Sequence, residues 1–393
     1  MTIPITKPVF GPEELRAVQE PLERGWVVQG PYVKKFEERF SEFTGATHSI
    51  ATSSCTTALH VAVAALGLKP GDEVIVPAFT WVATANVVEY MGARPVICDI
   101  DLATFNIRTD QIEGLVTDRT VGIIPVHLFG LCADMKPVLE VARRHNLWVV
   151  EDAACGLGGW YEGAHAGTMG DMGCFSFHPR KSITTGEGGM ITTAQAEHDS
   201  RCRSLRDHGA SRSDHDRHTN AAGFLLSDYD MLGYNYRMTD IQGALGCAQM
   251  DRVTWILERR RFVAERYDEM LADVPWLKTP AVRDGFVHGY QSYVCLFQPE
   301  EPSAGSVERL SSRRNALMAR MEADGVATRQ GTHAAHLQGF YREKYGIAPG
   351  DFLNAWLADR LSISLPLYAQ MTEAEQDEVV SSLKQAFGAP SKD

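Results

Sequence analysis

The sequence lacks any long apolar run: no stretch of its 393 residues approaches the roughly 20 apolar residues that a membrane-spanning helix needs. Its first residues, MTIPITKPVFGPEELRAV, show no basic region followed by an apolar core, so no signal peptide is predicted. Acidic side chains outnumber basic ones, and the net charge of −12 argues against a nucleic-acid-binding protein. These absences predict a cytoplasmic protein whose partners are neither membranes nor nucleic acids.

The eight cysteines are scattered along the chain. None forms a Cys-x-x-Cys pair, and no Cys/His group has the spacing of a zinc finger. The sequence therefore predicts reduced thiols and no metal site, in agreement with a cytoplasmic location.

What is present is the pattern of a folded α/β protein, with 44% apolar and 22% charged residues. Up to about residue 195, short apolar strands alternate with helices. This alternation predicts a mostly parallel, mixed sheet flanked by helices. The predicted strands lie at 72–79, 94–101, 120–130, 147–154, 172–178 and 188–193.

The second part of the chain has a different pattern. One long helix is predicted over 237–272, followed by an alternating strand at 289–298 and further helices. We therefore predict two domains: a large one over 1–255 and a smaller C-terminal α+β domain over 256–393.

Residues able to do chemistry lie where the predicted strands end, which is where open parallel sheets bind ligands. Cys55, Thr56 and Thr57 begin an apolar helix, and the free N–H groups of a helix N-terminus bind phosphate. An ordinary helix cap explains the same residues. Trp81 follows a strand and is suited either to stacking on a flat ring or to a place in the core.

Three further residues close the pattern. Asp152 ends a buried strand, either as a structural ion pair or as a counter-ion for a protonated ring nitrogen. Ser176 ends another strand, and Lys181 follows it in CFSFHPRKSITTGEGGMITT. A solvated surface lysine is the ordinary interpretation of Lys181. Together, however, a phosphate cradle, an aromatic platform, an aspartate and a lysine are the parts that a pyridoxal phosphate site needs.

The sequence resembles the DegT/DnrJ/EryC1/StrS family of pyridoxal-phosphate-dependent sugar aminotransferases over nearly its full length. The residues that carry the resemblance are GWVVQGPYVKKFEERF, TTALHVAVAALGLKPGDEVIVPAFTWVATAN, VVEDAACGLGGWYEG, GDMGCFSFHPRKSITTGEGGMITT, GYNYRMTDIQGALG and LPLYAQMTEAEQDEV. The resemblance implies the fold-type I aminotransferase fold.

The resemblance also implies roles for individual residues. Lys181 would form the Schiff base with the cofactor and move protons, and Asp152 would pair with the pyridine nitrogen. Trp81 would stack on the ring. The residues around the phosphate would be Cys55, Thr56, Thr57 and Ser176, with Asn235 reaching the phosphate of the neighbouring subunit. The last role implies a homodimer with shared active sites.

One position departs from the family pattern. Where family members usually have Gln or His near the 3-hydroxyl of the cofactor, this sequence has Cys155. A thiol is a weak hydrogen-bond partner. The position is therefore either a tolerated small residue or a sign of different cofactor tuning.

The implied reaction moves an amino group from L-glutamate to a keto-sugar. The segments TRQGTHAAH and HPRKSITTGEGG resemble perosamine-synthase-like members, which aminate a nucleotide-linked 4-keto-6-deoxyhexose for surface polysaccharides or antibiotics. An amino-cyclitol or an acidic eight-carbon sugar is also possible. Arg329, His333 and His336 are candidate sugar contacts, although a solvated loop explains them equally well.

Two other functions fit parts of the pattern. A pyridoxal-phosphate-dependent sugar dehydratase would have His in place of Lys181, and its iron–sulfur form would need clustered cysteines. A non-catalytic regulator that binds the cofactor would not need Lys181, Asp152 and Ser176 together. Both alternatives are therefore less well supported than an aminotransferase.

Overall fold

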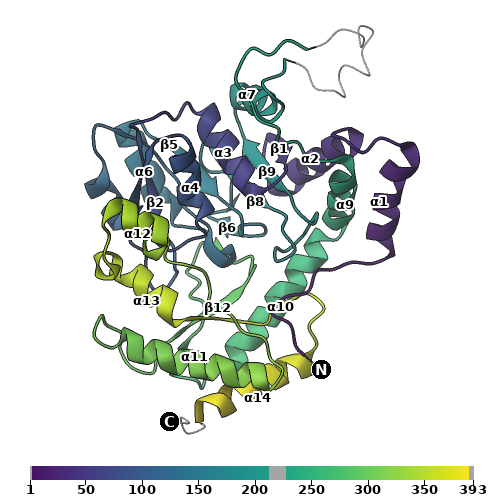
Figure 1. Cartoon of the computed structure of the whole chain (residues 1–393). Coiled ribbons are helices and arrows are strands. Elements are labelled where there is room, and N and C mark those ends of the chain that lie inside the picture. Colours follow the sequence, from purple (N-terminus) through teal and green to yellow (C-terminus); the bar gives the residue numbers. More distant parts are fainter. Residues whose placement is uncertain (1, 212–226, 389–393) are drawn as a thin grey trace.

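The computed structural model describes residues 2–211 and 227–388. Its centre is a seven-stranded sheet (Figure 1). The strands are β1 (His48–Thr52), β2 (Glu73–Pro77), β3 (Arg94–Cys98), β4 (Thr120–Ile123), β5 (Trp148–Asp152), β8 (Met172–Ser176) and β9 (Gly189–Thr193). Their order is β1-β9-β8-β5-β4-β2-β3, and only β9 runs against the others.

Helices surround this sheet. In chain order the helices of the described residues are α1 (Pro12–Arg24), α2 (Pro31–Thr44), α3 (Cys55–Ala65), α4 (Ala83–Tyr90), α5 (Thr109–Ile112), α6 (Met135–His145), α7 (Ala196–Arg206), α9 (Asp240–Asp251), α10 (Val253–Leu271), α11 (Val307–Ala323), α12 (Gly339–Tyr345), α13 (Leu353–Leu361) and α14 (Glu373–Gly388). No helix within residues 2–211 and 227–388 is long and apolar enough to cross a bilayer.

Strand β2 shows why the sheet is covered on both faces. Val74 and Val76 pack in the cluster that includes α3, whereas Ile75 packs in the cluster of α6. Successive side chains of a strand point to opposite faces, so an unbroken apolar strand needs a helix on each side. The predicted α/β fold class is confirmed.

The structure adds two features that the sequence pattern did not indicate. Strand β1 (His48–Thr52) pairs with β9 at the edge of the sheet, although Ile50 is its only large apolar residue. The single helix predicted over 237–272 is two helices, α9 and α10, which meet at Arg252. Arg252 and Gln249 at this junction both contact Glu14 of α1.

Two shorter sheets lie beside the large one. The first is antiparallel and consists of β10 (Leu277–Lys278), β12 (Tyr293–Phe297) and β13 (Ser362–Leu365). The second consists of β11 (Phe286–Val287), β6 (Trp160–Tyr161) and β7 (Ala164–His165). Helices α11 and α14 pack on each other along the lower edge of Figure 1.

The C-terminal part of the chain has a core of its own, in which α10, α11, α14 and β12 pack together. Helix α10 joins both cores: Ile256 packs on the large-domain side, and Val263 packs in the C-terminal core. Ile3 also belongs to the C-terminal core and exchanges backbone hydrogen bonds with Gly325 and Ala327. A boundary near residue 255 stays a prediction.

A buried ion network ties α2 to α7 and to the edge of the sheet. Glu37 accepts hydrogen bonds from Arg206 at 2.6 Å, from Arg203 at 2.8 Å and from the Ala51 amide at 2.8 Å. Burial raises the pKa of Glu37, but Arg206, Arg203 and the Ala51 amide outweigh it and hold that pKa below its usual value. Glu37 is therefore a charged group that the fold depends on.

We expect Glu37→Gln to lower the free energy of unfolding at pH 7 by about 3 kcal/mol, because breaking a buried ion pair leaves its partner charges uncompensated. Urea denaturation measures this difference. The matched control is Glu38→Gln, an exposed neighbour on the same helix, which should change the stability by less than about 0.5 kcal/mol.

The same pair of proteins gives a pH test. Because the pKa of Glu37 is lowered in the folded state, its contribution is complete above the unfolded-state pKa of about 4.3 and is lost as the pH falls through the folded-state pKa. The stability difference between wild type and Glu37→Gln should be constant near neutral pH and shrink below about pH 4.5. Equal stability of the two variants at pH 7 would contradict this account.

Candidate active site

The predicted site residues surround the ends of the central strands. Asp152 is the last residue of β5, and Ser176 is the last residue of β8. Trp81 follows β2, and Cys55 begins α3. Lys181 lies in the loop between β8 and β9, and its Nζ reaches the Cys155 Sγ at 3.1 Å. Side chains from three separate segments, the end of β5, the start of α3 and the loop of Lys181, therefore meet at the ends of the strands, as expected for a parallel sheet.

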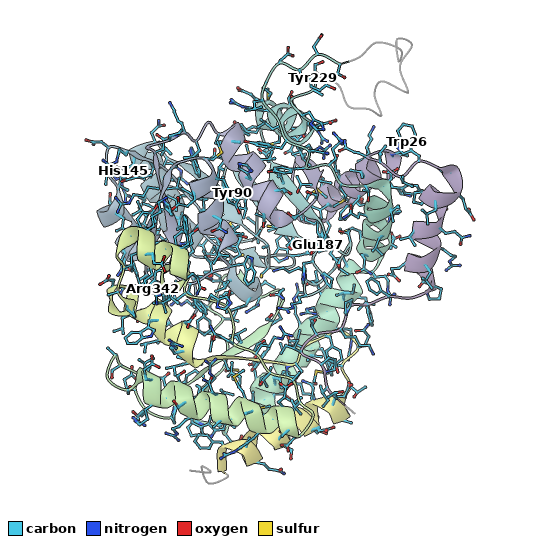
Figure 2. All side chains as sticks on the ribbon, in the orientation of Figure 1. Trp26, Tyr90, His145, Glu187, Tyr229 and Arg342 are labelled. Carbon is cyan, nitrogen blue, oxygen red and sulfur yellow. The ribbon has the colours of Figure 1, made fainter. Side chains whose placement is uncertain are left out.

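The loop over 177–188, which carries Lys181, is held by its own hydroxyl groups. Thr184 donates a hydrogen bond to the Phe177 carbonyl at 2.7 Å, and the Thr185 amide donates to the same carbonyl at 3.0 Å. Gly186 has a φ of 83°, which a side chain would strain. The Lys181 amide donates to the His178 carbonyl at 2.8 Å. Lys181 thus starts from a fixed backbone, in the same loop as Glu187, which is labelled in Figure 2.

Gly189 sets the distance between this loop and the start of α3. A Cβ at Gly189 would lie 2.4 Å from the Ser54 carbonyl carbon and 2.7 Å from the Cys55 nitrogen. No side chain fits between two backbones this close. The Gly-Gly end of the lysine loop is therefore what allows β9 to pass directly beside the N-terminus of α3.

The N-terminus of α3 is capped but keeps free donors. Ser54 accepts from the Thr57 amide at 3.2 Å, and the Thr57 hydroxyl donates to the Ser54 carbonyl at 2.8 Å. Thr57 is thus engaged in the cap, whereas the first-turn amides of Cys55 and Thr56 have no intrahelical partner. Burial raises the pKa of the Cys55 thiol, which donates to the Cys174 carbonyl. This helix end can bind an anion such as a phosphate.

Asp152 is buried and only partly satisfied. Thr84 donates to one of its carboxylate oxygens at 2.7 Å, and the Ala154 amide donates to the other at 3.1 Å. Burial raises the pKa of Asp152 above its usual value, and these two donors and Lys181 offset that effect only in part. A carboxylate in this position fits a ligand that brings its own positive charge, such as a protonated ring nitrogen.

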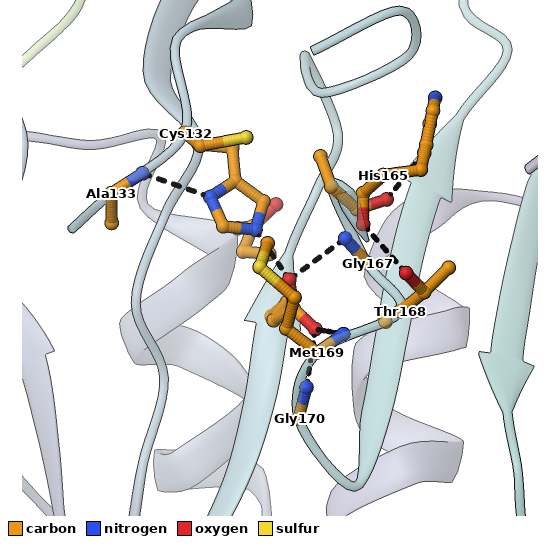
Figure 3. Close-up of polar contacts among 12 residues, drawn as sticks. Cys132, Ala133, His165, Gly167, Thr168, Met169 and Gly170 are labelled. Atoms are coloured by element: carbon orange, nitrogen blue, oxygen red, sulfur yellow. Dashed lines mark hydrogen bonds and ion pairs between the residues drawn. The ribbon is translucent and has the colours of Figure 1, made fainter. Parts of the chain in front are cut away.

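Its neighbour Glu151 is satisfied entirely by the protein. The side chain is fully buried, and its carboxylate accepts from the amides of Gly167, Met169 and Gly170 at 2.6–2.8 Å (Figure 3). The fourth donor is His127 Nε2 at 2.7 Å.

The tautomer of His127 follows from its second ring nitrogen. The Ala133 amide donates to Nδ1 at 3.1 Å, so Nδ1 carries no proton and the proton is on Nε2 (Figure 3). Because β5 side chains alternate across the sheet, Glu151 and Asp152 face opposite sides. The Glu151 carboxylate is therefore bound by donors of the protein itself, whereas the Asp152 carboxylate faces the side of the sheet on which Lys181 lies and could bind a ligand.

Lys181 is partly buried and charged. Burial disfavours its ammonium, but Cys155, Cys55 and Asp152 outweigh that effect and raise the pKa of Lys181 above its usual value. The lysine is therefore not the solvated surface residue of the ordinary interpretation.

The segment around His333 lies beside the loop of Trp81. The Thr80 amide donates to the His333 carbonyl, and the rings of Trp81 and His333 are 5.9 Å apart. Trp81 is 60% exposed, so it is not the core residue of the alternative interpretation. Arg329 is exposed as well, and its backbone pairs with Ser364.

His336 lies elsewhere. Its side chain is fully buried, packs against Phe352 and is 3.4 Å from the Pro349 carbonyl. Burial lowers the pKa of His336, in line with a neutral interior imidazole. This position does not favour the predicted contact with a sugar, since the side chain has no route to solvent. The sequence did not indicate that His336 is buried, because the segment TRQGTHAAHLQG is polar overall, although Ala334, Ala335 and His336 within it are buried.

Asn235 is exposed at the edge of the molecule. Its neighbours Tyr234 and Tyr236 are stacked with ring centroids 5.0 Å apart and pack against His60 of α3. In an extended segment alternate residues point to opposite sides, so Asn235 points away from the tyrosines. Tyr229, labelled beside α7 in Figure 2, is also exposed.

Two residues with a place in this site were not found from the sequence. Thr84 lies within α4 without a motif, and only the fold brings it to Asp152. Arg180 precedes Lys181, and its carbonyl accepts from Gln291 at 2.7 Å. Partial burial and the charge of Arg329 lower the pKa of Arg180, which places two cationic groups near one another. No group of metal-ligating side chains able to hold an ion occurs among the described residues.

The residues present fit pyridoxal phosphate: a carboxylate that lacks full charge compensation, free amides at a helix N-terminus, and a lysine beside both. Enzymes that bind this cofactor on a sheet of this topology form the fold-type I class, and this chain is one of them. More narrowly, the chain belongs to the DegT/DnrJ/EryC1/StrS aminotransferase family, whose sequence model matches residues 8–384. Members of this family are pyridoxal-phosphate-dependent sugar aminotransferases.

Individual relatives agree with this assignment. The spore coat polysaccharide biosynthesis protein SpsC of Bacillus subtilis is 37% identical, with 97% of this chain and 96% of SpsC covered. The sugar aminotransferase Spr1654 of Streptococcus pneumoniae, solved with its cofactor in the PLP form, is 28% identical with a TM-score of 0.89, over 98% of this chain and 99% of Spr1654. Helicobacter pylori PseC, an aminotransferase of pseudoaminic acid biosynthesis, is 25% identical with a TM-score of 0.89 over the same shares.

We expect Gly189→Ala to disturb the site, because its Cβ has no room beside Ser54. The free energy of unfolding should fall by about 1–3 kcal/mol, as for other overpacked positions, and affinity for pyridoxal phosphate should fall with it. The matched control is Gly114→Ala, where nothing lies within 4 Å of the added carbon. Denaturation and cofactor titration together measure the effect; a Gly189→Ala protein that matches the control in both would contradict it.

Proposed function

We propose that this protein transfers an amino group from L-glutamate to a nucleotide-linked keto-sugar, of the 4-keto-6-deoxyhexose type, for the synthesis of an amino sugar. The observation that carries the proposal is the position of Lys181, in contact with Cys155 and under the influence of the buried Asp152. The roles given to residues below are part of this proposal.

Bound pyridoxal phosphate supplies an aldehyde for amines and a ring that accepts electrons. Lys181 holds the aldehyde carbon, and Asp152 binds the ring nitrogen and keeps it protonated. Cys55, Thr56, Thr57 and Ser176 surround the phosphate, to which the helix end offers backbone amides. Trp81 would stack on the ring, and Cys155 would lie near its 3-hydroxyl.

Proton transfer is the task of Lys181. Once the amino donor has displaced it, its ε-amine would take a proton from the donor's α-carbon and deliver it to the former aldehyde carbon of the cofactor, on the other side of the shared nitrogen. The locked loop over 177–188 supports this role, since a short proton transfer requires a fixed starting point. The same amine returns the proton when the keto-sugar is aminated.

The substrates are proposed from charge and position. L-Glutamate and a nucleotide sugar both carry anionic groups, and Arg180, which directly precedes Lys181, and the nearby Arg329 offer two cationic side chains. His333 and Trp81 lie side by side and can contact a sugar ring. The names of SpsC and PseC, which concern polysaccharide and sugar biosynthesis, support a sugar acceptor.

A homodimer with shared active sites is part of the proposal. Asn235 is exposed and held by a stacked tyrosine pair, and Leu232, three residues before it, is 90% exposed. An exposed apolar side chain beside an exposed polar one favours contact with a second copy. Asn235 would then reach the phosphate bound by its partner. We also propose a cytoplasmic location, in which the eight free cysteines would stay reduced.

The first test is the visible absorption spectrum of the protein loaded with pyridoxal phosphate, before and after addition of L-glutamate. Wild-type protein should be yellow and bleach, because the proton transfer by Lys181 and the hydrolysis that follows would leave the amino group on the cofactor as an amine that is no longer conjugated with the ring. Lys181→Ala should bleach at least about 1,000-fold more slowly, since it lacks the proton-moving group. Lys136→Ala, an exposed position on α6, is the matched control and should behave as wild type.

A bleached wild-type protein then serves to identify the acceptor. Recovery of the yellow colour with UDP- or GDP-linked 4-keto-sugars, and not with the free sugars, is expected. A protein that stays yellow with every amino donor would contradict the proposed function.

Mixed dimers test the shared site. Equal amounts of Asn235→Ala and Lys181→Ala chains, unfolded and refolded together, should give dimers with one intact site in half of the cases, and thus about a quarter of the wild-type rate. Each variant refolded alone should stay inactive. No recovery in the mixture, with dimers demonstrated by chromatography, would place Asn235 in its own chain's site.

A further inference from the structure

Cys155 contacts the reactive end of Lys181 directly. The Lys181 Nζ donates a hydrogen bond to the Cys155 Sγ at 3.1 Å, within the reach of a bond to sulfur. Cys155 is partly buried, whereas the other seven cysteines are buried. Cys155 is therefore the most accessible of the eight cysteines.

The backbone that carries Cys155 is fixed on both sides. The Ala154 amide donates to the Asp152 carboxylate at 3.1 Å, and the Gly156 amide donates to the Ala153 carbonyl at 2.8 Å. A side chain of one carbon and one sulfur has a single rotatable bond on this turn. The position of the sulfur is thus set by the fold, and the flexible partner in the contact is Lys181.

The titratable groups around Lys181 come from several elements. Cys155 follows β5, Asp152 ends β5, Cys55 begins α3, and His178 belongs to the loop of Lys181 itself. Cys155 is the one that accepts a hydrogen bond from Nζ at a measured distance. Asp152 gives its oxygens to Thr84 and the Ala154 amide.

We propose that Cys155 is a positioning residue for Lys181: its sulfur holds the ε-amine in the pocket whenever that amine is free. The inference rests on the proposed function, in which the amine of Lys181 is displaced by the amino donor and must remain close to the reacting carbon. A lysine side chain has four rotatable bonds. Without a contact that holds the amine, the side chain populates many rotamers in which the amine lies away from the reacting carbon. Cys155 holds the amine by a hydrogen bond alone, so no covalent bond has to be broken when the amine moves.

The contact also affects the protonation of Lys181. Burial lowers the pKa of a lysine, and the interaction of Lys181 with the Cys155 sulfur, including its hydrogen bond, is the main effect that opposes burial here. Removal of the sulfur leaves burial less opposed, although Cys55 and Asp152 still act. The pKa of Lys181 should therefore fall when Cys155 is replaced by alanine.

The first experiment follows the pH dependence of Lys181 labelling by trinitrobenzenesulfonate in the full-length, cofactor-free protein, with the modified residue identified by mass spectrometry. In Cys155→Ala the midpoint should shift down by about one pH unit, the equivalent of one lost hydrogen bond to a charged group. Cys155→Ser keeps an acceptor and should fall between Cys155→Ala and wild type. The matched control is Cys247→Ala on α9, which should leave the midpoint unchanged.

Folding is checked by circular dichroism, and Cys155→Ser decides the outcome if the alanine variant does not fold. A folded Cys155→Ala protein with the wild-type midpoint would overturn the inference, as would a midpoint that rises. A shift that Cys247→Ala reproduces would overturn it too, because the effect would then not depend on the contact with Nζ.

The second experiment separates positioning from binding in the cofactor-loaded enzyme. Cys155→Ala should lower the kcat of the glutamate half-reaction about 10-fold and change KM by less than about twofold, because the amine is misplaced while the donor still binds. Cys155→Ser should recover most of the rate. A loss in KM alone, or no loss at all, contradicts the inference.

The two proposals fail separately. If wild-type protein transfers no amino group, the proposed function is wrong, and the labelling midpoint still decides whether Cys155 holds Lys181. If transfer occurs and the midpoint and kcat do not respond to Cys155→Ala, only the inference about Cys155 is wrong.

Discussion

The site depends on how the end of β5 keeps two negative side chains inside the protein. A buried carboxylate is strongly unfavourable unless donors or cations surround it. Glu151 receives three backbone amides and a histidine N–H, so its charge is met by the fold. Asp152, one residue later, receives two donors and keeps a raised pKa. The strand thus carries, on one face, a carboxylate with four donors and, on the other, a carboxylate with two donors and a raised pKa, which a cationic ligand would stabilise further.

The groups that would meet such a ligand are held by backbone geometry more than by side-chain packing. Thr184 and Thr185 close the lysine loop on Phe177, and Gly189 lets β9 pass against the start of α3. The result is a fixed distance between the lysine and the helix amides. Preorganisation of this kind removes the need to reorganise the protein as charge moves during the reaction. The few flexible parts, above all the side chain of Lys181, then need an anchor of their own.

Much of this arrangement follows from local sequence, and the rest required the fold. Strands β2, β3, β4, β5, β8 and β9 were predictable because each is a short apolar run between turns. Asp152 and Lys181 were found because they end or follow such runs, and Cys55 was found because it begins an apolar helix. Strand β1 was not predictable, since Ile50 is its only large apolar residue and the segment gains strand structure by pairing with β9. The break at Arg252 and the inward turn of His336 depend on contacts with distant segments. Thr84 and Arg180 carry no motif, and the contact between Lys181 and Cys155 joins residues 26 positions apart. Such contacts have no signal in periodicity or spacing.

The residues proposed for proton transfer and those proposed for substrate choice are held in place in different ways. The groups proposed for proton transfer lie on the large sheet and its loops, where carbonyls, glycines and hydroxyls fix them. The segment of Arg329 and His333 instead docks through its backbone: Arg329 pairs with Ser364, and the carbonyl of His333 accepts from Thr80. Backbone pairing does not depend on which side chains the segment carries. The exposed side chains of Arg329 and His333 could therefore be replaced without moving the segment. Such replacements could adapt the segment to one acceptor or another while Lys181 and Asp152 stay in place. A sequence therefore indicates the reaction of such a protein more clearly than the sugar on which it acts.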